Sequence, residues 1–105
     1  MDFPNPFTQP GTWFKGCLHV HSTASDGDRT QAEVLDWYQT RGYHFVALTD
    51  HRVCSEAESV DTDFVTLAGV ELDGTDSQAG LYHVVGLASA WPQEFSSASN
   101  QSMQD

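Results

Sequence analysis

The chain has few basic residues, few cysteines and no long apolar segment. Four Lys and Arg residues stand against fifteen Asp and Glu residues, so the formal net charge is -11 at pH 7. This charge argues against a nucleic-acid-binding surface built from the chain's own basic side chains. The lack of an apolar run of spanning length predicts a soluble globular chain that does not cross a membrane. An anionic substrate would need bound cations to offset the acidic charge.

Cysteine is too scarce for a disulfide framework. The two cysteines, Cys17 and Cys54, form no CxxC motif, and this usage suits a reducing compartment. The N-terminus lacks the basic start and apolar core of a secretory signal. We therefore expect a cytoplasmic location, with the 105 residues forming one domain or part of one.

The hydrophobic pattern predicts an α/β fold that begins with a strand, a helix and a second strand. Apolar and polar residues alternate over 14–21, which is typical of a strand. Thr30 and Glu33 form a capping-box pattern, which predicts a helix from Thr30 to about Arg41. The short apolar run 45–48 indicates a strand buried on both faces. This order predicts a parallel βαβ unit.

The second half of the chain predicts two more strands. Residues 52–63 are a polar connection, and residues 64–72 and 81–87 are the predicted strands. Residues 73–80, with the sequence DGTDSQAG, indicate a loop between these strands.

Two histidines stand one residue apart in the segment CLHVHSTASDGD. Residues i and i+2 of a strand point the same way, so His19 and His21 share a face about 6 to 7 Å apart. That spacing allows both imidazoles to bind one cation. An isolated His-x-His pair is equally compatible with ordinary strand residues that hydrogen-bond to their neighbours.

Four more side chains that can bind metals follow or lie in the predicted strands. They are Asp26, His51, Glu71 and His83. The C-terminal ends of successive parallel strands converge in a (β/α) barrel, so we expect these side chains to cluster with the histidine pair. Imidazole and carboxylate ligands without a thiolate set favour zinc, manganese or iron.

Several nearby residues carry weaker signals. Cys17 shares the predicted face of the two histidines, and we interpret it as a small buried residue rather than a ligand. Asp50 either orients the histidine that follows it or caps the strand end. His44 is a predicted surface residue. Arg29 and Arg52 could hold a substrate phosphate, with plain solvation as the alternative.

Four motifs occur in a characteristic order. LHVHSTASDG, VALTDH, GVEL and YHVVGL resemble the first motifs of the PHP family (polymerase and histidinol phosphatase domain), metal-dependent phosphoesterases with a distorted (β/α)7 TIM-like barrel. Residues 1–13 have three prolines and no periodicity and predict an irregular lead-in, and the polar, serine-rich residues 91–105 predict a polar tail. The resemblance implies the N-terminal part of a PHP domain over 14–90. The family's later histidine and Asp-x-His pair are absent after His83, which implies an incomplete barrel in this chain.

The resemblance also implies a site with two or three metal ions. The implied ligands are His19, His21, Asp26, His51, Glu71 and His83. The first two would bind one metal, Glu71 would bridge two metals, and His83 would serve the second. Asp26 and His51 would serve a third. Asp26, His51 and Glu71 are the predicted catalytic residues, because such metals bind phosphate oxygens and activate water for attack at phosphorus.

Glu71 differs from the other candidate carboxylates because it follows an apolar strand segment instead of lying in a loop. A carboxylate held stiffly in this way suits the bridging role. The alternative is a buried carboxylate paired with Arg29 or Arg52.

The predicted function is a metal-dependent phosphoesterase acting on a phosphorylated small molecule or nucleotide. A metal-dependent amidohydrolase is one alternative, because its barrel also opens with a His-x-His strand. The segments SDG and TDH favour the phosphoesterase. A metal-binding or structural module without turnover is the other alternative, because PHP domains also occur attached to polymerases, and the absence of later ligands favours it.

Overall fold

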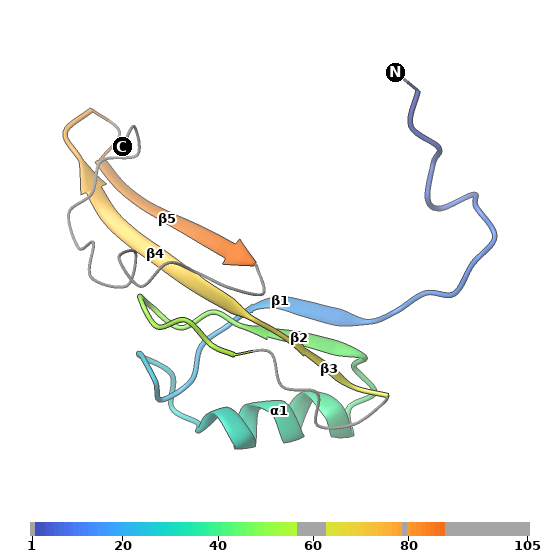
Figure 1. Ribbon diagram of the computed structural model, residues 1–105, viewed down its shortest axis with the longest axis horizontal. Helices are drawn as coiled ribbons and strands as arrows, with labels where there is room; N and C mark the ends of the chain where they lie inside the picture. Colours follow the sequence, from blue (N-terminus) through green and yellow to red (C-terminus); the bar gives the residue numbers. More distant parts are fainter. Residues whose placement is uncertain (1, 57–62, 79, 88–105) are drawn as a thin grey trace.

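The computed structural model describes residues 2–56, 63–78 and 80–87. The predicted polar tail over 91–105 lies outside the described residues, as does part of the predicted connection over 52–63. The elements, in chain order, are β1 (Gly16–Val20), α1 (Gln31–Thr40), β2 (Phe45–Leu48), β3 (Val65–Leu67), β4 (Gly69–Asp76) and β5 (Gly80–Leu87) (Figure 1).

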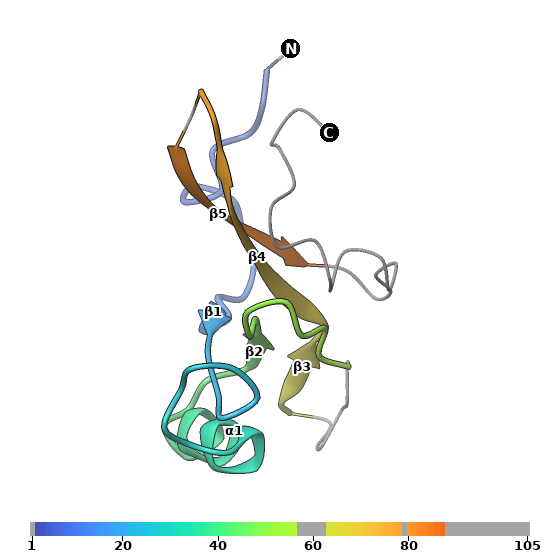
Figure 2. The ribbon, with the colours of Figure 1, turned by 90° about the vertical axis from the view of Figure 1, so that its left-hand side faces the viewer.

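The first three strands form a parallel sheet in the order β1-β2-β3, with α1 packed beneath it (Figures 1 and 2). The predicted parallel βαβ unit is therefore confirmed. The central strand β2 has Val46 and Ala47 fully buried, and Phe64 and Val70 add to the same core. These apolar side chains hold the strands whose C-terminal ends lie near the candidate metal ligands.

Local interactions account for the helix. The Glu33 N–H donates to Thr30 Oγ1 at 3.2 Å, and the Thr30 N–H donates to Glu33 Oε2 at 2.8 Å, so the predicted capping box is confirmed. The Thr30 N–H, and then the Thr30 hydroxyl, which donates to Glu33 Oε2 at 3.1 Å, hold the pKa of the Glu33 carboxyl below its usual range. Gly42 follows with φ 78°, a left-handed conformation that suits glycine and ends the helix.

The C-terminal strands differ from the sequence prediction. The segment expected as one strand over 64–72 is broken at Ala68 into β3 and β4, and the loop expected over 73–80 is largely strand, because β4 continues to Asp76. β4 and β5 pair antiparallel along their whole length. The two strands therefore form an antiparallel hairpin. A parallel crossover needs roughly a dozen residues or more, far more than residues 77–79 can provide.

The β4-β5 hairpin joins the sheet beyond the C-terminal end of β2. His51 and Glu71 form an isolated parallel bridge, in which the Glu71 N–H donates to the Asp50 carbonyl at 3.1 Å and the Arg52 N–H donates to the Glu71 carbonyl at 2.8 Å. Gly69 allows the close approach, since a Cβ there would lie 2.9 Å from a carbonyl oxygen of β2. This crossing brings β4 over the residues that follow β2.

Residues 2–15 contain neither helix nor strand and extend away from the sheet (Figure 1). Of the described residues, none belongs to a helix with the length and apolar character needed to cross a bilayer.

Candidate metal centre

The predicted metal ligands come from distant parts of the chain and meet at one end of the sheet. His19 lies in β1, His21 follows β1, and Asp26 lies in the β1-α1 loop. His51 follows β2, Glu71 lies in β4, and His83 lies in β5. Three overlapping groups have their ligand atoms within 4.8 Å of one another: His19, His21 and Glu71; His21, Asp26 and His51; and His51, Glu71 and His83. The described residues thus contain histidine and carboxylate clusters that could hold metal ions.

Glu71 lies at the centre of these groups and is only 3% exposed. Its Oε1 is 2.6 Å from His83 Nδ1. Its Oε2 faces the Nε2 atoms of His21 at 2.8 Å, His51 at 3.6 Å and His19 at 3.7 Å. Oε2 is nevertheless buried without a hydrogen bond of good geometry. Such an atom is costly in a protein interior, and a cation shared with the surrounding imidazoles would satisfy it.

The His19 ring is oriented by a hydroxyl group from the end of β2. His19 Nδ1 lies 2.7 Å from Thr49 Oγ1, which also accepts the Val20 N–H at 3.1 Å and donates to the Val20 carbonyl at 3.3 Å. Thr49 Oγ1 can therefore accept a hydrogen bond from the His19 Nδ1–H, and in that tautomer the Nε2 lone pair faces Glu71. This is the tautomer that metal binding through Nε2 requires.

The His51 ring is held by a carboxylate from β4. His51 Nδ1 lies 3.1 Å from Asp73 Oδ1, and Asp73 Oδ2 lies 2.6 Å from the Arg52 guanidinium. On its other side, His51 Nε2 faces Asp26 Oδ2 at 3.3 Å. Arg52 therefore pairs with Asp73 and not with Glu71. The predicted alternative, a buried Glu71 carboxylate paired with Arg52, is not observed.

Asp50 holds the loop between β1 and α1. It is fully buried and accepts the Ser22 N–H at 2.6 Å, the Ser22 hydroxyl at 2.7 Å and the Ser25 hydroxyl at 2.7 Å. Burial alone would raise the pKa of the Asp50 carboxyl, but these hydrogen bonds outweigh it and lower the pKa below its usual range. These contacts hold the β1-α1 loop that carries Asp26, and they are made to Ser22 and Ser25 instead of to the His51 ring or the end of β2.

Asp26 is the most exposed of the candidate ligands. Its side chain is 66% exposed, with Oδ1 3.3 Å from His21 Nδ1 and Oδ2 3.3 Å from His51 Nε2. Gly27 closes the loop that carries it, because the Gly27 N–H donates to the Ser22 carbonyl at 2.8 Å. Asp26 therefore stands at the solvent side of the cluster, where a substrate or a metal-bound water would arrive.

Cys17 does not join the histidine cluster. The β1-β2 register shifts between Cys17 and Val20, and the Cys17 side chain hydrogen-bonds with the His19 carbonyl at 3.6 Å and with Tyr38 of α1. Burial, and then this hydrogen bond, raises the pKa of the Tyr38 hydroxyl to about 12. The prediction that Cys17 shares the face of His19 and His21 is therefore wrong, because strict alternation ignores the register shift.

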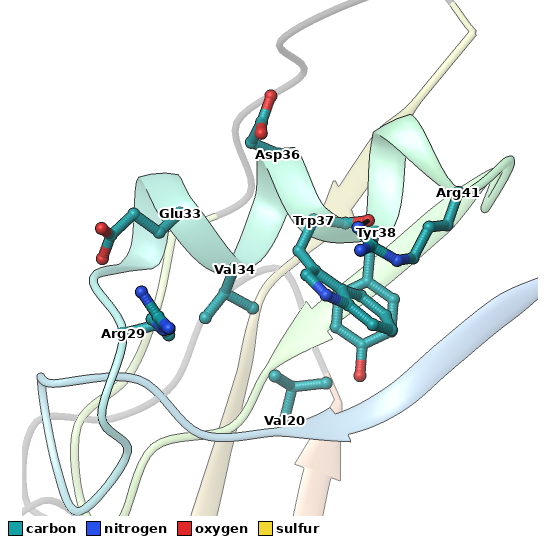
Figure 3. A pocket seen from close by; sticks show the side chains of 8 residues that line it. All are labelled: Val20, Arg29, Glu33, Val34, Asp36, Trp37, Tyr38 and Arg41. Carbon is teal, nitrogen blue, oxygen red and sulfur yellow. Dashed lines mark hydrogen bonds between the residues drawn. The ribbon is translucent and has the colours of Figure 1, made fainter.

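The predicted substrate arginines lie in different places. Arg52 borders the cluster through Asp73, whereas Arg29 lines a cavity of about 520 Å³ beneath α1 that none of the predicted ligands lines (Figure 3). His44 is exposed, as predicted, and its Nδ1 accepts the Lys15 N–H at 2.9 Å.

Sequence reasoning missed the residues that support the ligands, above all Asp73 and Thr49. Asp73 was assigned to a loop, yet it follows Glu71 by two positions in β4, and strand periodicity puts both on one face. The Glu-x-Asp spacing was therefore a usable signal. Nothing in the local pattern marks Thr49, because its partner in β1 is 30 positions away along the chain.

Comparison with known proteins gives limited similarity. No family model matches the chain. The DNA polymerase/3'-5' exonuclease PolX of Bacillus subtilis (strain 168) is 33% identical over 78 residues, which cover 56% of this chain. The chain spans 14% of the length of this curated relative. The similarity is compatible with a metal-dependent hydrolase.

Proposed function

We propose that the chain is part of a PHP-type phosphoesterase that uses two or three divalent metal ions, zinc, manganese or iron. The observation that carries this proposal is the buried Oε2 of Glu71, which lacks a hydrogen bond and faces three imidazole nitrogens. Nitrogen and oxygen ligands of this kind suit these metals. On this proposal the described strands and helix are the N-terminal portion of a distorted (β/α)7 barrel.

The side chains have distinct tasks in the proposed site. Glu71 would bridge two metals, since each of its oxygens faces a different set of imidazoles. Asp26 would complete the coordination at the exposed side, beside His21 and His51. Bound metals would supply an activated water and positive charge for a phosphoryl group. That positive charge also makes an anionic substrate compatible with a chain of net charge -11.

The relative adds support of a general kind. PHP domains occur attached to polymerases, and the similar protein is by its name a polymerase with exonuclease activity. The proposed substrate is accordingly a phosphoester of a small molecule or a nucleotide. We also propose a cytoplasmic location, since Cys17 and Cys54 are both free thiols.

Metal analysis tests the first half of this proposal. The chain, purified without chelators and dialysed against each metal, should contain at least one bound equivalent by elemental analysis. The double variant His19→Ala/His21→Ala should lose metal, because two ligands of one group disappear. His44→Ala, a histidine outside the cluster, should keep it. Equal metal content in the double variant and the wild-type chain would refute the site.

Turnover tests the second half. A protein that contains this chain together with the family's later histidine and Asp-x-His pair should hydrolyse a chromogenic phosphomonoester or phosphodiester in a metal-dependent way, whereas it should not hydrolyse an N-acyl amide substrate. Preferential cleavage of the amide would favour the amidohydrolase alternative. Metal binding by that protein without any turnover would favour a structural module and reject the proposed phosphoesterase activity.

A further inference from the structure

We propose that Asp73 is a positioning residue that sets the tautomer and orientation of His51, and that Arg52 holds Asp73 in place. This inference rests on the proposed function, because it assigns a role in metal binding to two residues that are not themselves proposed ligands. It follows from contacts on the side of His51 that faces away from the cluster.

The first step is the direction of the hydrogen bond at His51. Asp73 Oδ1 lies 3.1 Å from His51 Nδ1, and an ionised carboxylate can only accept. A neutral His51 ring that donates this hydrogen bond carries its proton on Nδ1. The opposite nitrogen, Nε2, keeps its lone pair and faces Asp26 Oδ2 at 3.3 Å and Glu71 Oε2 at 3.6 Å. Asp73 thus favours the His51 tautomer that can bind a metal.

The second step is the anchoring of Asp73 by Arg52. The Arg52 guanidinium donates to Asp73 Oδ2 at 2.6 Å, so each carboxylate oxygen has its own partner. The Arg52 N–H also donates to the Glu71 carbonyl at 2.8 Å, which ties the backbone to the same strand. Arg52 has φ 56°, a left-handed conformation that costs free energy in a non-glycine residue. The side-chain and backbone hydrogen bonds to β4 hold Arg52 in this conformation.

The third step is the location of Asp73 on β4. Asp73 lies two positions after Glu71 and opposite His83 in the antiparallel register, so it is on the strand face that carries the proposed ligands. Its side chain is 21% exposed, and water therefore has limited access to the contact with His51. A rigid strand places the carboxylate beside the imidazole, as an orienting group requires.

The decisive test reads the His51 tautomer in the metal-free chain. Long-range ¹H–¹⁵N correlation spectra at about pH 8.5, above the ordinary histidine pKa of about 6.5, distinguish Nδ1–H from Nε2–H rings. We expect the Nδ1–H form in the wild-type chain and a shift toward the Nε2–H form in Asp73→Ala. An unchanged Nδ1–H signal in Asp73→Ala would overturn the inference. Asp73→Leu fills the same space without an acceptor and gives the same readout if the alanine variant does not fold.

Metal affinity provides the second readout. Competition with a chelator should show Zn²⁺ or Mn²⁺ binding weakened about tenfold to a hundredfold in Asp73→Ala. Arg52→Gln should weaken it less, because Asp73 remains next to His51. Asp76→Ala removes the same charge from the same strand away from the cluster and should leave affinity unchanged. Equal losses in the Asp73 and Asp76 variants would show a general charge effect and overturn the positioning role.

The two proposals fail in different ways. A wild-type chain that binds no metal refutes the proposed function, while the tautomer spectra still decide whether Asp73 orients His51. A wild-type chain that binds metal as tightly as Asp73→Ala leaves the proposed function standing and rejects the role of Asp73.

Discussion

The helix α1 and the histidine cluster satisfy their polar groups in opposite ways. In α1 the partners are local, as in the Thr30 and Glu33 capping box and the Arg41 guanidinium that donates to the Trp37 carbonyl at 3.1 Å. In the cluster the partners come from β1, β2, β4 and β5, and the buried Oε2 of Glu71 is left without a hydrogen bond. The helix satisfies these polar groups with its own residues, whereas the cluster leaves a buried oxygen that a bound cation could satisfy. We infer that the first region serves folding and the second serves binding.

The residues around the cavity beneath α1 also interact with partners close to the helix, unlike the residues of the cluster. Trp37, Tyr38 and Val34 point from the helix toward Val20 of β1, and Arg41 lies over the Trp37 ring at 4.0 Å (Figure 3). These are packing and cation-π contacts between residues of the helix and its neighbouring strand. Variants in the two regions should therefore change different measured quantities.

The largest effect is expected from Glu71→Gln. Glutamine keeps the size of the side chain but removes the charge that would screen two nearby cations from each other. We expect normal helical content by circular dichroism, loss of at least one metal equivalent, and loss of most phosphoester hydrolysis. Full metal occupancy with wild-type turnover would remove the proposed bridge and the contrast between the regions.

The next largest effect is expected from metal addition to the wild-type chain. A metal at about 100 times its dissociation constant should raise the free energy of unfolding by about 2.7 kcal/mol, because it binds the folded state alone. Thermal melts with and without chelator measure this difference. Glu71→Gln should show a much smaller increase, and an equal increase in both chains would place the bound metal elsewhere.

A smaller effect is expected from Asp50→Asn, which links the two regions through the β1-α1 loop. The variant weakens charge-assisted hydrogen bonds from Ser22 and Ser25. Because Asp50 is fully buried, we expect a loss of about 1 to 3 kcal/mol in the free energy of unfolding. Denaturant titration provides the measurement. Asp36→Asn, at an exposed helix position, serves as the control and should be near neutral.

The smallest effect is expected from Thr30→Ala. Loss of the helix N-cap should lower the free energy of unfolding by about 1 kcal/mol. Metal content should remain that of the wild-type chain, because the cap lies in α1 and contacts none of the proposed ligands. Paired melting and elemental analysis check both statements. A loss of metal in Thr30→Ala would show that the two regions are coupled.

Much of the fold was predictable where contacts are local. The capping pattern at Thr30 and Glu33 correctly predicted the helix, and the apolar run 45–48 correctly predicted β2. The break at Ala68 and the antiparallel hairpin were not predictable in this way. Strand periodicity reports which residues alternate, but it does not report which strand they pair with.

The candidate site likewise has features that were predictable from the local sequence and features that were not. The sequence by itself determined the candidate ligands, because metal-binding residue types such as His19 and His21 are recognisable from their chemistry and spacing. Only the tertiary structure decided how they are supported, by placing Thr49 beside His19 and Asp73 beside His51. It also placed Cys17 beside Tyr38 of α1 instead of in the cluster. These outcomes depend on contacts between residues far apart in the chain, and local patterns carry no information about such contacts.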